Sequence, residues 1–198
     1  MEGIIGLEDG TILRGKGFGL EGWVAAEMCF NTSMTGYEEI LTDPSYKGQV
    51  VALTCPEIGN TGINPEDEES EKPQVSGLVV RRLSRRASNW RQRETLDVYL
   101  RRHKIPAVEG VDTRALTRKL RIQGAMKGVL ATNGMSGEEA VRKAKEWPGL
   151  GRRIMWPRSP ARNRMNGIRK VWISPGNWEP RRWRCPRRGI GWRRSIVE

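Results

Sequence analysis

The sequence has few of the residues on which disulfide-bonded and metal-binding proteins depend. Only three cysteines occur in 198 residues, namely Cys29, Cys55 and Cys185, and no Cys-x-x-Cys pair or Cys/His cluster is present. An odd, widely spaced set of cysteines gives neither a disulfide framework nor a zinc site. Cys29 and Cys55 lie in apolar runs, so we interpret them as buried core thiols.

Long apolar stretches are also absent. No run of 18 apolar residues occurs, so the sequence predicts no membrane-spanning helix. Residues 1–10 contain Glu2, Glu8 and Asp9 and lack the apolar centre of a signal peptide. We therefore expect a cytoplasmic protein with no membrane partner.

Histidine and phosphate-binding motifs are scarce as well. The single histidine, His103, ends a predicted helix over residues 96–103, where it suits the helix dipole and needs no catalytic role. The glycine-rich run at residues 15–19 lacks the G-x-G-x-x-G spacing and the lysine-serine pair of phosphate-binding loops. We interpret this run as a flexible connection between strands.

Charge divides the chain into two parts. Residues 1–150 contain 21 Lys and Arg and 21 Asp and Glu, whereas residues 151–198 contain 14 basic residues and two acidic ones. The formal net charge of +12 therefore belongs to the last 48 residues. These residues also hold five of the eight tryptophans, and five prolines interrupt any regular pattern.

Three interpretations of residues 151–198 follow from this composition. Arginine interleaved with aromatic residues can bind nucleic acid or anionic surfaces through phosphate contacts and stacking. A disordered basic extension has a similar composition. Tryptophan, arginine, proline and glycine also have GC-rich codons, so an out-of-frame translation of a GC-rich gene fits as well, and we favour it.

Hydrophobic periodicity and turn residues predict a mixture of strands and helices in residues 1–150. An Asp9-Gly10 turn of type I′ is expected to join the first two strands. Further strands are expected at residues 23–30, 49–55, 75–83, 107–108 and 126–131, and helices at residues 36–42, 96–103, 113–123 and 137–147. Asp112 is expected to cap the third helix, and the spacing of Ser136 and Glu139 predicts a capping box at the start of the fourth. The predicted fold class is α+β.

The stretch at residues 30–46 is the densest run of small polar groups and turn signals. Thr35 and Glu38 have the spacing of a capping box, and Asp43-Pro44 ends the helix that it begins. Asn31, Thr32 and Ser33 follow a strand, where polar side chains can face a site or satisfy the turn backbone. From composition alone we favour the second role.

Two charged clusters flank the predicted strand at residues 75–83. An acidic run over residues 66–71 is predicted to be a solvated surface rather than a metal site. Four arginines, at positions 81, 82, 85 and 86, could meet an acidic partner surface or a phosphate. A plain exposed loop explains them equally well.

Several segments together resemble one family. Beyond residues 30–46, the matching segments are Leu7–Thr11, Ile58–Gly62, Asp67–Ser70, Ala87–Arg91, Tyr99–Ile105 and Asp112–Arg118. In this order they resemble the small subunit of glutamine-hydrolysing carbamoyl-phosphate synthase, over about residues 3–150. A near-continuous match of 17 residues is far more specific than a short motif.

The resemblance implies a fold and a role. Residues 1–150 would form the amino-terminal domain of the small subunit, a three-layer β/β/α domain that packs on the large subunit. The large subunit would use ATP and Mg²⁺ to make carbamoyl phosphate for pyrimidine and arginine synthesis, and this chain would hold no cofactor. Ser45 matches the serine that, in the family, helps to bind glutamine at the domain boundary, and the resemblance gives no reason to expect nucleic acid as a partner.

One part of the family pattern is absent. The glutaminase of the family uses a Cys-His-Glu site whose cysteine lies in a Gly-x-Cys-x-Gly context. No cysteine of this chain has that context, and Cys185 lies in Trp-Arg-Cys-Pro-Arg. We therefore expect no catalytic residue and no glutaminase activity in this chain, and either a shift of reading frame near residue 150 or a truncated reading.

Overall fold

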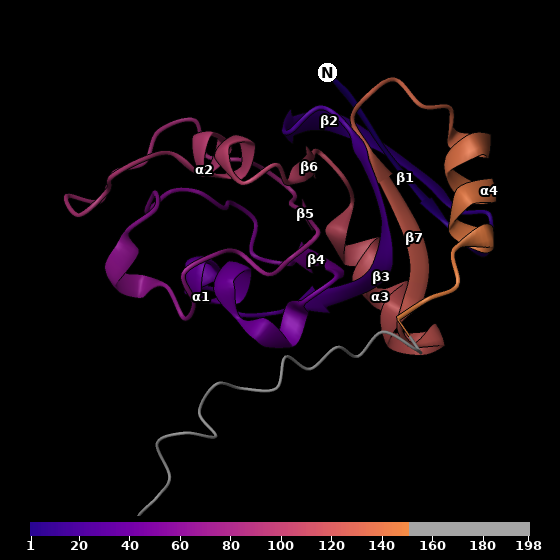
Figure 1. The fold of residues 1–198 in the computed structure, drawn as a ribbon, viewed down its shortest axis with the longest axis horizontal. Helices are drawn as coiled ribbons and strands as arrows, with labels where there is room; N and C mark the ends of the chain where they lie inside the picture. The colour runs from indigo at the N-terminus through magenta and orange to yellow at the C-terminus, as the bar shows by residue number, and fades with distance from the viewer. Residues whose placement is uncertain (151–198) are drawn as a thin grey trace, which may run out of the picture. The chain divides into compact units, whose positions relative to one another are not determined.

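The computed structural model describes residues 1–150, which contain seven β-strands and four α-helices (Figure 1). The strands are β1 (Glu2–Leu7), β2 (Ile12–Gly19), β3 (Trp23–Asn31), β4 (Gln49–Leu53), β5 (Gly77–Val79), β6 (Pro106–Glu109) and β7 (Met126–Ala131). The helices are α1 (Tyr37–Thr42), α2 (Leu96–Arg102), α3 (Thr113–Gln123) and α4 (Gly137–Glu146), with 3₁₀ turns at Pro44–Tyr46 and Pro65–Asp67.

The strands close into one barrel, in the order β1-β2-β6-β5-β4-β3-β7. Four neighbouring strands, β3 to β6, pair in parallel, and the remaining pairs are antiparallel. The predicted mixture of strands and helices is confirmed. The finer prediction of a three-layer β/β/α arrangement is not confirmed by the strand pairing and stays a prediction.

The inside of the barrel is filled by side chains from six strands. The cluster includes Ile5 of β1, Met28 of β3, Val50 of β4 and Leu130 of β7, all fully buried. Leu116 and Leu120 of α3 join the same cluster. Since each buried aliphatic side chain contributes about 1.5–3 kcal/mol, this cluster is a principal source of stability.

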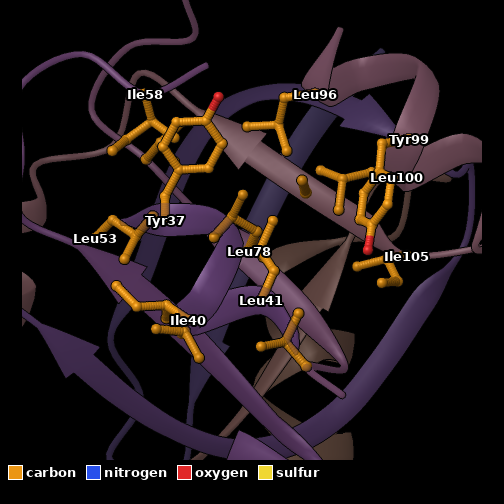
Figure 2. Close-up of a cluster of buried hydrophobic side chains, with 14 of the residues drawn as sticks. Tyr37, Ile40, Leu41, Leu53, Ile58, Leu78, Leu96, Tyr99, Leu100 and Ile105 are labelled. Atoms are coloured by element: carbon orange, nitrogen blue, oxygen red, sulfur yellow. The ribbon is translucent and has the colours of Figure 1, made fainter. Parts of the chain in front are cut away.

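A second cluster lies between the barrel and helices α1 and α2 (Figure 2). Leu41 of α1 and Leu100 of α2 pack with Leu53 and Leu78 from the strands. A third, smaller cluster joins α4 to β1 and β7. Strand β4 is therefore buried on both faces, which explains why its sequence, Gln-Val-Val-Ala-Leu, is an apolar run without alternation.

Several local predictions are confirmed to within one or two residues. Helix α3 is capped by Asp112, whose Oδ1 accepts a hydrogen bond from the Ala115 amide at 3.0 Å. Helix α4 is capped by Ser136, whose Oγ accepts from the Glu139 amide at 3.2 Å. Both caps satisfy amides that the first helical turn leaves unpaired, which is why their sequence signals were informative.

Two predictions about the first strands are wrong. The β1–β2 loop has four residues, and Gly10 accounts for its only positive φ, so it is not a two-residue type I′ turn. The run Gly15–Gly19 is not a flexible connection, because it forms the second half of β2. A β-carbon at Gly15 would lie 2.3 Å from the carbonyl oxygen of Glu109, so close strand packing requires glycine there.

The fifth strand is also shorter than predicted, because only Gly77–Val79 of residues 75–83 pair as a strand. The interpretations of residues 151–198 and of Cys185 lie outside the described residues and stay predictions. Within residues 1–150, no helix is long and apolar enough to cross a membrane.

Close packing of α4 on β1 gives a testable consequence at Gly6. A β-carbon there would lie 2.7 Å from the main-chain nitrogen of Val141 in α4. We expect Gly6→Ala to lower the free energy of unfolding by about 1–3 kcal/mol, because backbone must move to admit the methyl group. The matched control is Gly22→Ala, whose β-carbon meets nothing closer than 3.6 Å. Equal urea midpoints for the two variants would contradict this packing.

Candidate functional site

Helix α1 begins differently from the prediction. Its N-cap is Gly36, in a left-handed conformation with φ of 74°, and no side chain caps the helix. The Ile40 amide donates to the Gly36 carbonyl oxygen at 3.2 Å. The predicted capping box of Thr35 and Glu38 is therefore wrong, because the Glu38 carboxylate turns away from the Thr35 amide to another partner.

That partner is a loop distant in sequence. The Glu38 side chain is only 5% exposed, and its Oε2 accepts a hydrogen bond from the Asn64 amide at 2.8 Å. Burial, together with the smaller effect of the negative charges of Asp67, Glu39 and Glu68, raises the pKa of Glu38 to about 7, against the lowering effect of the Asn64 hydrogen bond. The carboxyl group therefore holds a proton over a pH range in which ordinary glutamates are ionised.

Tyr37 makes a second connection from α1 to this loop. Its hydroxyl donates to the Gly62 carbonyl oxygen at 2.5 Å and accepts from Thr61 Oγ1 at 2.9 Å. Burial raises the pKa of Tyr37 to about 12, so the hydroxyl stays a donor at physiological pH.

The end of α1 makes a third connection. Thr42 Oγ1 accepts from the Glu69 amide at 2.9 Å, and its carbonyl oxygen accepts from Ser70 Oγ at 2.6 Å. The Leu41 carbonyl oxygen accepts from the Gln74 amide at 2.8 Å. A six-residue helix is too short to be stable alone, so these contacts hold it in place.

Ser45 lies in the 3₁₀ turn that follows α1. Its amide donates to Asp43 Oδ1 at 2.7 Å, and Pro44 fixes the preceding backbone. The Ser45 side chain is exposed, and within residues 1–150 its hydroxyl forms no hydrogen bond. A hydroxyl on a rigid, exposed turn is free to donate and accept hydrogen bonds with a small polar molecule.

Of the polar residues at the end of β3, Asn31 forms side-chain hydrogen bonds within the domain. Asn31 Nδ2 donates to the Tyr46 hydroxyl at 2.9 Å, and Asn31 Oδ1 accepts from the Ser33 amide at 2.7 Å. Asn31 therefore joins the end of β3 to the turn that carries Ser45, as the turn-satisfying interpretation predicts. Thr32 and Ser33 are exposed.

Two surface hollows lie near these elements, and Ser45 lines neither of them. The smaller, of about 70 Å³, lies between the start of α1 and the loop at residues 57–61. The larger, of about 410 Å³, is lined by Trp23, Lys72, His103 and Lys104 among others.

His103 occupies the position that the sequence predicts, at the C-cap of α2. Its ring lies 4.6 Å from the ring of Tyr99, centroid to centroid. Burial and the neighbouring Arg102 charge lower the pKa of His103. The His103 ring therefore packs on Tyr99 at the end of α2.

The acidic run beside Glu38 is held by an arginine. Arg91 Nη2 donates to both carboxylate oxygens of Asp67, at 3.0 and 3.3 Å, and Nη1 lies 3.5 Å from Glu66 Oε2. Residues 1–150 contain no cluster of three or more His, Cys, Asp or Glu side chains arranged for a metal ion. Sequence reasoning missed the Glu38–Asn64 contact, because nothing local indicates a partner 26 residues away.

The raised pKa of Glu38 predicts a dependence of stability on pH. Below pH 4.5 the carboxyl group is protonated in both states, and its contribution to stability is lost as pH rises through about 7. We expect the free energy of unfolding to fall by about 2 kcal/mol between pH 5 and pH 8 because of this group.

Glu38→Gln keeps an acceptor for the Asn64 amide and removes the ionisation, so it should flatten this dependence. The measurement is urea unfolding at pH 5, 6, 7 and 8. Glu57→Gln, an exposed carboxylate in the adjacent loop, is the matched control and should behave as the unsubstituted chain does. A Glu38→Gln profile with an unchanged slope would contradict the assignment.

Comparison with known proteins identifies the family. Residues 5–130 match the model of the carbamoyl-phosphate synthase small chain, CPSase domain. The chain is 49% identical to the carbamoyl phosphate synthase small chain of Nostoc sp. over 150 residues, which are 76% of this chain and 39% of that protein. It is 51% identical to the carbamoyl phosphate synthase small chain of Archaeoglobus fulgidus over 148 residues. This alignment covers 75% of this chain and 41% of the relative.

The small chain of Aquifex aeolicus is 45% identical over 179 residues, 90% of this chain and 47% of the relative. An alignment of that length extends past residue 150. The chain spans less than half the length of each of these relatives. By its sequence and by the residues that the family model covers, the chain belongs to the carbamoyl-phosphate synthase small chain family.

Proposed function

We propose that residues 1–150 are the part of a carbamoyl-phosphate synthase small chain that contacts the large chain, and that the 198-residue chain does not itself hydrolyse glutamine. The observation that carries the proposal is the family match over residues 5–130, which covers the barrel from β1 into β7. The name "small chain" of the relatives supports a large chain as partner.

The proposed role lies in making carbamoyl phosphate for pyrimidine and arginine synthesis, with ATP and Mg²⁺ bound by the large chain. The three-layer β/β/α arrangement is part of the same proposal. The 198 residues contain no Gly-x-Cys-x-Gly segment, which supports the proposal that they do not hydrolyse glutamine. A thiolate nucleophile in such a turn is the group that attacks the amide carbon.

Binding to the large chain tests the first half of the proposal. We expect the purified 198-residue chain to form a complex with the large chain encoded in the same genome, measured by light scattering after gel filtration. We expect no release of ammonia from glutamine by the chain or by the complex, with the full-length Nostoc small chain as the positive control. Absence of a complex would contradict the proposed contact with the large chain. Release of ammonia from glutamine would contradict the proposal that the chain does not hydrolyse glutamine.

The coding sequence tests the interpretation of residues 151–198. Reading the gene in all three frames after codon 150 should reveal a glutaminase sequence with a Gly-x-Cys-x-Gly segment in another frame. The alignment with the Aquifex aeolicus small chain continues past residue 150. The gene sequence should therefore also show at which codon the reading frame shifts. A gene without such a segment in any frame would contradict the frameshift.

For Ser45 we propose a contact with the substrate glutamine at the boundary between this domain and the glutaminase. The exposed hydroxyl, the rigid Asp43-Pro44 turn and the position of Ser45 within the matching segment at residues 30–46 support this role. The walls and nucleophile of such a site would come from the glutaminase domain, so Ser45 contributes binding rather than catalysis.

A hybrid chain tests this contact, with residues 1–150 joined to the glutaminase part of the Nostoc small chain. Loss of one uncharged hydrogen bond costs about 0.5–1.5 kcal/mol, so Ser45→Ala should raise the KM for glutamine about 3- to 10-fold with little change in kcat. Ser33→Ala, an exposed serine at the end of β3, is the matched control. An unchanged KM for Ser45→Ala would overturn the contact.

A further inference from the structure

The loop at residues 84–93, termed the Trp90 loop, is firmly attached to the body of the domain. Its Ser84 amide donates to the Ile58 carbonyl oxygen at 2.7 Å, and its Ser88 amide donates to that of Asn60 at 2.8 Å. Its Arg93 amide donates to the Ile63 carbonyl oxygen at 2.9 Å. These hydrogen bonds connect both ends and the middle of the loop to residues 58–63, the same segment that Tyr37 holds from α1.

The tip of this attached loop presents an indole to solvent. Asn89 Oδ1 accepts from the Arg91 amide at 3.1 Å, and the Asn89 carbonyl oxygen accepts from the Gln92 amide at 3.1 Å, so a turn surrounds Trp90. The Trp90 side chain is 90% exposed, more than any other large apolar residue in residues 1–150. A tryptophan offers about 150–250 Å² of surface for burial. Because Trp90 is 90% exposed, little of that surface is buried within this domain.

Charged groups surround the indole in the sequence of the loop. Arg85, Arg86 and Arg93 are exposed, and none of them takes part in the ion pairs that form within residues 1–150. Arg91 alone is paired, and its partners are carboxylates of the acidic run, Glu66 and Asp67. The surface around the loop therefore combines one exposed aromatic anchor, free arginines and a neighbouring group of carboxylates.

This combination indicates a protein partner rather than a nucleic acid. Arg91, one of the four arginines of the loop, is already paired with Glu66 and Asp67, so it is not free to contact a phosphate backbone. Residues 1–150 contain equal numbers of basic and acidic side chains and so give no overall attraction for a polyanion. A protein surface can offer an apolar pocket for the indole and carboxylates for the arginines, which are the pairings found at interface hot spots.

We infer that the Trp90 loop is the docking anchor for the large chain, with Trp90 inserted in an apolar pocket whose rim carries acidic side chains. The inference rests on the proposed function, because the large chain is the partner proposed there. It goes beyond that proposal by assigning the contact to one loop.

The test measures the affinity of the 198-residue chain for the large chain encoded in the same genome by biolayer interferometry. Trp90→Ala should raise Kd at least about 30-fold, as truncation of a central hot-spot tryptophan does. Trp90→Phe should keep most of the affinity, with a change of less than about 5-fold. The double variant Arg85→Glu, Arg86→Glu should lower the association rate and reduce its dependence on salt.

Ile122→Ala is the matched control, because Ile122 is an 81% exposed apolar residue on α3. Its Kd should equal that of the unsubstituted chain, and all variants should keep the same thermal unfolding midpoint, since none of the substituted side chains is buried.

Each other outcome is decisive. If the unsubstituted chain and Trp90→Ala bind equally well, the assignment of the anchor fails and the proposed function stands. If the unsubstituted chain does not bind the large chain, the proposed function fails and the assignment fails with it. Binding of a 20-nucleotide single-stranded RNA that Trp90→Ala abolishes, without an effect on the large chain, would overturn the protein anchor in favour of nucleic acid.

Discussion

Hydrogen bonds from α1 to the loop at residues 58–74 are the interactions on which the functional surface depends. Glu38, Tyr37 and Thr42 each reach a main-chain group of this loop, at Asn64, Gly62 and Glu69 respectively. The loop in turn holds residues 84–93 through its own backbone. One short helix therefore leads directly into the turn with Ser45 and is connected, through the loop at residues 58–74, to the loop with Trp90.

The barrel supplies the base on which α1 can act in this way. Val50 and Ala52 of β4 face the interior cluster, whereas Val51 and Leu53 face the cluster beneath α1 and α2. Because neighbouring strand residues point to opposite faces, a shift by one residue in β4 would exchange both sets and disrupt both cores. The hydrophobic contacts of Tyr37, Ile40 and Leu41 with the second cluster then fix the orientation of the polar side chains on the same helix (Figure 2).

Burial gives the polar contacts of α1 their chemical character. A carboxyl group that is 5% exposed and lies near other carboxylates binds a proton more tightly than it does in water, so the Glu38 carboxyl group is mostly neutral below about pH 7. The Tyr37 hydroxyl is also kept neutral by burial. Neutral partners suit a loop whose main-chain groups would otherwise be buried without hydrogen bonds.

The sequence by itself determined most of the local structure. Strand β7, helices α3 and α4 and their caps at Asp112 and Ser136 follow from short-range patterns, because a cap or an apolar period acts within a few residues. The family followed from residues 30–46 and the later matching segments. Tertiary structure decided how the strands close into a barrel, why Gly15 lies within a strand, and where the Glu38 carboxylate points. Those outcomes depend on groups far apart in the chain, such as Glu109 beside Gly15 and Asn64 beside Glu38, and spacing along the sequence does not encode such distances.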